Sequence, residues 1–197
     1  MPAALRRITA DDIVPDAAFA AERKARRAAL LETKRVRRVS LGPWATLHFE
    51  SYETMLFQVQ EMLLIEKGGP AQLAEELAAY NPLIPQGAEL TATVMFEIDD
   101  PNRRVRILAE LGGVEDCFFV DVEGERAAGV QEGDVERTRE DGKTSSVHFL
   151  HFPLTPSQIA AFRREGARVM VGCDHPKYHH LAALSEATRA GLERDLA

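Results

Sequence analysis

Cysteine is the scarcest reactive residue in this chain of 197 residues, which contains only Cys117 and Cys173. Two thiols so far apart in sequence provide neither a disulfide framework nor a thiolate zinc site. Each lies in a segment with the pattern of a strand. We therefore predict that both are reduced and buried, as structural thiols of an intracellular protein are.

Long apolar runs are also absent, and no segment has the length of a membrane-spanning helix. The first fourteen residues, MPAALRRITADDIV, lack the apolar core of a signal peptide. We therefore expect a cytoplasmic protein that does not enter a membrane. The apolar content of 45% is typical of a globular protein, and 197 residues suffice to build a hydrophobic core.

Several catalytic motifs are missing. The chain has no Gly-x-Ser-x-Gly elbow, and neither cysteine lies in a recognisable catalytic context. No glycine-rich phosphate loop follows a strand-like segment, so the familiar kinds of nucleotide binding have no support. The sequence thus offers no motif for nucleophilic catalysis.

Charge is distributed unevenly along the chain. Residues 1–38 contain ten Lys or Arg and five Asp or Glu, a net charge of +5; the whole chain carries −7, so the remainder carries −12. The basic cluster from Arg23 to Arg38 has two interpretations, contact with a phosphate or an acidic partner and a solvated helix face. No aromatic residue interrupts it, and the rest of the chain is strongly acidic, which argues against nucleic-acid binding.

The segment from Trp44 to Glu66 is the most informative part of the sequence. Residues 44–50 alternate, with Ala45, Leu47 and Phe49 on one side, which predicts a half-buried strand. Ser51 then provides a helix cap. From Tyr52 the apolar residues recur at helical spacing, and Gly68-Gly69 ends this helix.

Polar side chains gather around the junction of this strand and helix. Thr54, Gln58 and Glu61 lie in one row of the predicted helix. One interpretation is a site for a divalent metal ion or a small molecule, formed by His48, Glu50, Glu53, Gln58 and Glu61. The other is that these are solvated residues, because their spacing matches no standard metal-ligand motif.

The remaining pattern predicts an α+β fold, with a mainly antiparallel sheet packed against several amphipathic helices. We expect one domain over residues 1–197, with a basic helical segment (1–38), a strand-helix-helix segment (39–88) and antiparallel strands with two C-terminal helices (89–197). We expect an antiparallel meander of strands at residues 90–98, 104–111, 116–123, near Val135 and at 147–152, and a last strand at 169–173 after a helix. Thr155, Pro156 and Gln158 predict a helix start, and a last helix is expected from about Tyr178.

Histidines form a second candidate site near the C-terminus. His175 and His179 are four residues apart and would share a face if their segment were helical, although Pro176 favours a helix start after His175. His148 and His151 are separated by an odd number of positions. On a strand they would point to opposite faces, which argues against a joint site.

The segment LGPWATLHFESYETMLFQVQEMLLIEK, together with YNPLIP, LTATVMFEI and DHPKY, resembles a bacterial family known as domain of unknown function 3501. The pattern FE-x-x-x-T-x-x-x-Q-x-x-EM carries this resemblance, with Glu50, Thr54, Gln58 and Glu61 as its polar positions. The family often has Asn where this chain has Ser51. Genes of that family tend to lie beside those for rubrerythrin and an iron–sulfur reductase-like protein. The resemblance therefore implies a role near redox or peroxide metabolism. It implies no catalytic residues.

Three functions follow as hypotheses. The first is an accessory or ligand- or metal-binding protein of a redox system, with a rubrerythrin-like or iron–sulfur protein as its partner. The second is a metal-dependent enzyme that joins His48, Glu50 and Glu61 to a C-terminal histidine. The third is a structural interaction domain whose basic N-terminal helix binds an acidic partner.

Overall fold

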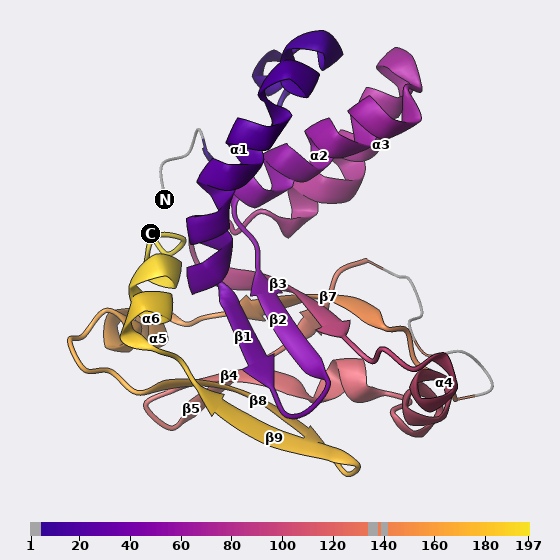
Figure 1. The fold of residues 1–197 in the computed structure, drawn as a ribbon. Coiled ribbons are helices and arrows are strands. Elements are labelled where there is room, and N and C mark those ends of the chain that lie inside the picture. The colour runs from indigo at the N-terminus through magenta and orange to yellow at the C-terminus, as the bar shows by residue number, and fades with distance from the viewer. Residues whose placement is uncertain (1–4, 134–137, 139–141) are drawn as a thin grey trace.

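The computed structural model describes residues 5–133, 138 and 142–197. Within these residues, two antiparallel sheets are flanked by helices (Figure 1), which confirms the predicted α+β class. The helices are α1 Asp16–Val36, α2 Tyr52–Glu66, α3 Gly69–Tyr80, α4 Pro101–Glu110, α5 Pro156–Phe162 and α6 Glu186–Glu193. The strands are β1 Arg38–Leu41, β2 Ala45–Phe49, β3 Glu89–Phe96, β4 Phe118–Val122, β5 Glu125–Ala128, β6 Val130–Gln131, β7 Val147–Pro153, β8 Val169–His175 and β9 Tyr178–Ala183.

The strands do not form the simple meander that the sequence predicts. One sheet has the order β1-β2-β3-β7-β6, and the other has the order β5-β4-β8-β9. Strand β3 pairs with β7 instead of with the next strand in sequence, and the register places His48 opposite Thr93 and Thr93 opposite Phe149. Because side chains alternate across a sheet, these three residues form a row on one face.

The hydrophobic core lies between the two sheets. Their facing side chains include Leu47, Leu90, Leu150, Val120 and Val171, all fully buried. The sheets also approach each other along β1 and β9 and along β5 and β7. The outer face of the five-stranded sheet is therefore the face left for polar residues and for the helices.

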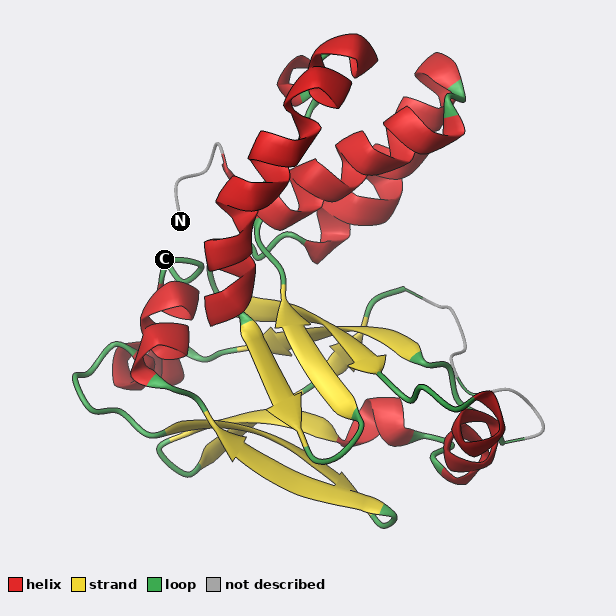
Figure 2. Ribbon diagram, viewed as in Figure 1, coloured by secondary structure: helices red, strands yellow, loops and turns green. Residues whose placement is uncertain are grey.

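Helices α1, α2 and α3 form an arm that projects away from the sheets, as Figure 2 shows. The arm has its own apolar cluster, which includes Tyr52, Met55, Val59 and Leu63 from the predicted stripe of α2. Ser51 caps α2 as expected, since its hydroxyl accepts a hydrogen bond from the Thr54 N–H. The base of the arm stands at the end of the five-stranded sheet where β2 runs into α2.

The predicted strand over residues 104–111 is wrong, because this segment forms α4. Asp100 accepts a hydrogen bond from the Arg103 N–H, and Pro101 occupies the first turn. An N-cap followed by proline starts a helix, and this local signal prevails over the alternation of apolar residues.

The predicted helix from Tyr178 is also wrong. Residues 178–183 form β9, which pairs with β8, and the last helix begins at Glu186 after the Ser185 cap. The Tyr178 hydroxyl contacts the β1–β2 turn, where it donates a hydrogen bond to the Leu41 carbonyl and accepts one from the Ala45 N–H. The prediction rested on the helical spacing of Leu181, Leu184, Leu192 and Leu196, and these tertiary contacts override it. The strand predicted near Val135 lies outside the described residues.

Both cysteines carry free thiols, as predicted, and Cys173 is buried in the strand β8. The prediction of a buried strand position is wrong for Cys117, which is half-buried at the end of the 3₁₀ turn Val114–Cys117. Burial raises the pKa of the Cys173 thiol to about 12, which keeps it protonated and unreactive at neutral pH. Among the described helices, none is both long enough and apolar enough to cross a membrane.

Candidate functional site

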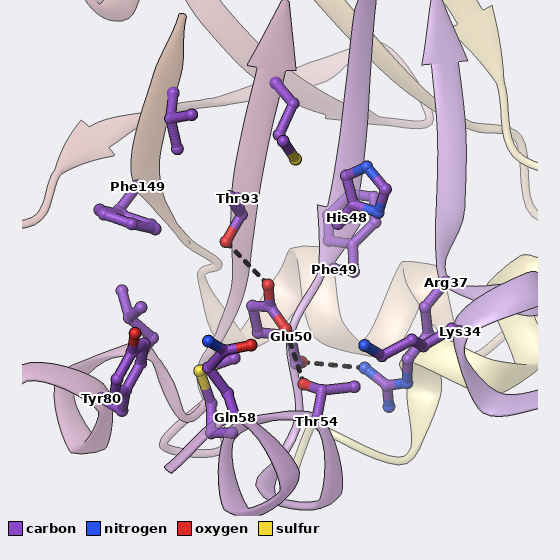
Figure 3. Close-up of a pocket in the computed structure, with 14 residues that line it drawn as sticks. Lys34, Arg37, His48, Phe49, Glu50, Thr54, Gln58, Tyr80, Thr93 and Phe149 are labelled. Carbon is purple, nitrogen blue, oxygen red and sulfur yellow. Dashed lines mark hydrogen bonds between the residues drawn. The ribbon is translucent and has the colours of Figure 1, made fainter. Parts of the chain in front are cut away.

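A cavity of about 380 Å³ lies at the base of the helical arm, against the outer face of the five-stranded sheet (Figure 3). Strands β2, β3 and β7 form one wall, and α1, α2 and α3 contribute residues from the other side. This volume is within the range of pockets that bind small organic molecules.

Glu50 lies at the centre of the cavity, where β2 passes into α2, and only 9% of its surface is exposed. The Thr54 hydroxyl donates a hydrogen bond of 2.6 Å to Oε2, and the Thr93 hydroxyl donates one of 2.7 Å to Oε1. Burial raises the pKa of Glu50 above its usual value, and these two hydrogen bonds oppose that shift. Within the described part of the chain, no cation lies within 4.0 Å of this carboxyl group.

Arg37 holds the backbone beside this carboxyl group. Its Nη1 donates a hydrogen bond of 3.0 Å to the Glu50 carbonyl. The same guanidinium makes two hydrogen bonds of 2.7 Å to Asp195, and both side chains are buried. Asp195, near the C-terminus, is therefore the ion-pair partner of Arg37, and Arg37 favours the ionised form of Glu50 only through a weaker electrostatic attraction.

His48 and Lys34 line the cavity on the side of β2 and α1. His48 is half-buried, and burial lowers the pKa of its imidazole, which favours the neutral ring. Its Nε2 atom is buried without a hydrogen-bond partner among the described residues. Lys34 comes from the last turn of α1, and Figure 3 shows its side chain reaching toward Glu50.

The rest of the lining is mostly apolar. The side chains of Met95, Val147 and Phe149 come from β3 and β7, and those of Leu83 and Met55 close the cavity toward the arm. Gln58 and Tyr80 add a polar edge. Burial raises the pKa of Tyr80, and a hydrogen bond from Gln58 opposes that shift. The cavity thus combines polar groups at its centre with an apolar wall.

The five residues predicted from the strand–helix junction do not form one ligand set. His48, Glu50 and Gln58 line the cavity, whereas exposed Glu53 accepts a hydrogen bond of 2.7 Å from the Ser51 hydroxyl. Glu61 lies further along α2 and forms an ion pair of 2.6 Å with Arg23 of α1. In residues 5–133, 138 and 142–197, no group of three or more His, Cys, Asp or Glu side chains is arranged to hold a metal ion.

The C-terminal histidines are separated too. His175 is buried in β8, whereas His179 is exposed on β9 and lies 3.4 Å from Asp174. The condition for a shared helix face, a helical segment, is not met, because this segment is a β-hairpin.

His148 and His151 point to opposite faces of β7, as predicted. His148 is buried in the core, and His151 lies between Glu89 and Glu132 at 3.0 and 2.6 Å. The hydrogen bond with Glu89 is the main reason that the pKa of His151 is raised.

The sequence did not identify Lys34, Thr93, Tyr80 or Phe149 as members of a site with Glu50. They come from α1, β3, α3 and β7 and meet only in the folded chain. The alternation of β3 and β7 contained part of the signal, since it places Thr93 and Phe149 on the outer face. The pairing of β3 with β7, which brings them together, is a long-range feature.

Comparison with known proteins identifies a family without an assigned activity. Residues 7–196 match the family model described as a protein of unknown function (DUF3501). A solved structure from Burkholderia pseudomallei K96243, described as a novel protein of unknown function, is 36% identical and has a TM-score of 0.89. The match covers 96% of this chain and 99% of that one. No curated protein matches the chain.

Proposed function

The chain belongs to the DUF3501 family, and we propose that it is a binding protein for a small organic molecule, held in the cavity around Glu50. One observation carries this proposal: a buried carboxyl group faces a cavity and has no ion-pair partner among the described residues. Buried charges are normally paired, because moving an ion out of water without a partner costs about several kcal/mol of folding free energy. A bound ligand with a hydrogen-bond donor would provide the missing partner.

A binding role fits the geometry better than a metal site does. Glu50 already accepts hydrogen bonds from Thr54 and Thr93. Of the five residues predicted as ligands, only Glu50 and His48 both line the cavity and carry a strong metal-ligating group. Catalytic metal sites generally use three protein ligands. An organic ligand needs only the acceptor and the apolar wall.

Thermal-shift screening of purified protein tests the proposal, with a library of small amines, acids, zwitterions and neutral compounds. We expect at least one class to raise the melting temperature, because a ligand that binds only the folded state stabilises it. The Glu50→Gln variant should lose this response.

Glu115→Gln is the matched control. Glu115 is also buried and accepts hydrogen bonds from two threonine hydroxyls, those of Thr138 and Thr144, but it does not line the cavity. This variant should keep the response of the wild-type protein. A library with no binder at millimolar concentration, or binders that Glu50→Gln retains in full, would contradict the proposal.

The redox role remains part of the proposal and rests on the family resemblance alone. In that account, the protein delivers or senses its ligand for a rubrerythrin-like or iron–sulfur partner. Calorimetric titration with each purified partner, with and without a ligand from the screen, tests this step. Absence of binding under both conditions would contradict the partnership and leave the binding function intact.

A further inference from the structure

Two opposite charges line the cavity without forming an ion pair; Glu50 is buried, and Lys34 is an exposed residue of α1. Glu50 presents its carboxyl group from the β2–α2 junction, and Lys34 extends its ammonium group from α1 toward it (Figure 3). In the described residues, neither group has an ion-pair partner within 4.0 Å, and they do not pair with each other. Among the described residues, Lys34 makes one cation–π contact, in which its ammonium nitrogen lies 5.8 Å from the centroid of the Phe57 ring.

Neighbouring ionisable groups in the described part of the chain form no ion pair with these two charges, and Lys34 and Arg37 act on Glu50 only through weaker electrostatic attraction. Arg37 is bound to Asp195 by two hydrogen bonds, and His48 is held toward its neutral form by burial. Among the described residues that line the cavity, Lys34 is therefore the one cation without a carboxylate partner. A ligand that brings a negative group to Lys34 and a positive group to Glu50 would pair both charges.

The wall opposite the helices defines the remainder of such a ligand. Met95, Val147 and Phe149 form an apolar surface on β3 and β7 next to Thr93. A hydrophobic side group would bury this surface and remove its apolar area from water, which favours binding.

We propose that the ligand is a small amino-carboxylate with an apolar side group, whose ammonium binds Glu50 and whose carboxylate binds Lys34. This inference rests on the proposed binding function and specifies its ligand class. The side group lies against Met95, Val147 and Phe149. A simple organic cation would be repelled by Lys34, and a simple carboxylate would be repelled by Glu50.

Matched probes test the inference by isothermal titration of the full chain. The probes are phenylalanine and leucine, with the decarboxylated amine and the deaminated acid of each. We expect at least one of the two amino acids to bind. Its amine and its acid should each bind at least about tenfold more weakly, because each loses a charge-assisted hydrogen bond.

Variants assign each charge to its residue. Lys34→Met should reduce the preference for the amino acid over its amine, and Glu50→Gln should reduce the preference over its acid. Lys24→Met is the matched control, because Lys24 is an exposed lysine of the same helix and does not line the cavity. It should change neither preference.

The outcomes separate this inference from the binding function. Equal binding of an amino acid and its amine, or a preference that Lys34→Met leaves unchanged, would overturn the ligand class. The ligand class would also be overturned if neither amino acid binds while other compounds in the thermal-shift screen bind in a Glu50-dependent way. In that case the proposed binding function would still stand. If no compound binds at all, both proposals fail.

Discussion

The Thr93 hydroxyl of β3 donates a hydrogen bond of 2.7 Å to the Glu50 carboxyl group at the end of β2. Thr54 of α2 donates the second hydrogen bond, so the carboxyl group is held by a strand and a helix at once. This arrangement fixes the position of a group that burial makes costly to ionise. Glu50 is therefore the residue from which both the stability and the binding of this protein can be tested.

Glu50→Gln should alter the pH dependence of stability. The folded pKa of Glu50 is raised above its usual 4.5, so the folded protein holds this proton more tightly than the unfolded chain does. The corresponding stabilisation is present below pH 4.5 and is lost as the pH rises through the folded pKa.

Glutamine has no such proton, so the free energy of unfolding of Glu50→Gln should rise relative to wild type across this window and then level off. Urea denaturation of both proteins from pH 4 to pH 8 measures the difference. Parallel curves would show that Glu50 has an ordinary pKa.

Asp195→Asn should destabilise the protein strongly. The change leaves the buried guanidinium of Arg37 without its counter-charge, and breaking a buried pair in this way typically costs about 3–5 kcal/mol. Arg38→Met is the control, because Arg38 forms an ion pair with Glu97 at the surface, where the two side chains are 50% and 41% exposed. It should have little effect. Comparable losses in the two variants, measured by urea denaturation, would show that the Arg37–Asp195 pair is not buried in solution.

Glu61→Ala should leave ligand binding unchanged. Glu61 contacts Arg23 of α1 through two hydrogen bonds of 2.6 and 2.7 Å and is not part of the cavity lining. The pair is partly exposed, so its loss should lower the melting temperature by no more than a few degrees. Arg23→Ala should have the same effect, and the double variant should be no worse than either. Loss of ligand binding in Glu61→Ala would instead return Glu61 to the site.

Gly42→Ala should destabilise the packing of the β1–β2 turn on β9. Gly42 has a φ of +64°, and an added Cβ would lie 2.5 Å from the His180 ring. Gly124→Ala provides a matched control, since Gly124 also has a positive φ but has open space around it. Both variants incur backbone strain of about 1 kcal/mol or more, and only Gly42→Ala adds the steric clash. Equal losses would mean that the turn does not pack against His180.

Local signals predicted much of the fold. The alternation in β2, the Ser51 cap and the helical stripe of α2 are all present in the structure, because each is fixed by residues close in sequence. The same kind of signal exists at Asp100-Pro101, where an N-cap precedes proline. There the alternation of apolar residues in 104–111 suggested a strand, although the cap marked the start of α4.

Long-range pairing explains what the sequence could not show. The segment of Tyr178 becomes β9 because it pairs with β8 and because its hydroxyl group binds the β1–β2 turn. The site has the same limitation. Glu50 and Gln58 were candidates from the sequence, but Thr93, which donates a hydrogen bond to Glu50, and the cation Lys34 are placed by tertiary structure. Glu61, from the same polar row, turned out to join two helices.

The titration of Glu50 tests the central claim most directly. Carbon-13 NMR of the side-chain carboxyl group, assigned with Glu50→Gln, gives its pKa in the free protein and with saturating phenylalanine or leucine. We expect a pKa above the usual value in the free protein, because the carboxyl group is buried, and a decrease on binding, because an ammonium group then pairs with it. A pKa at or below the usual value in the free protein, or no change when the amino acid binds, would contradict the account.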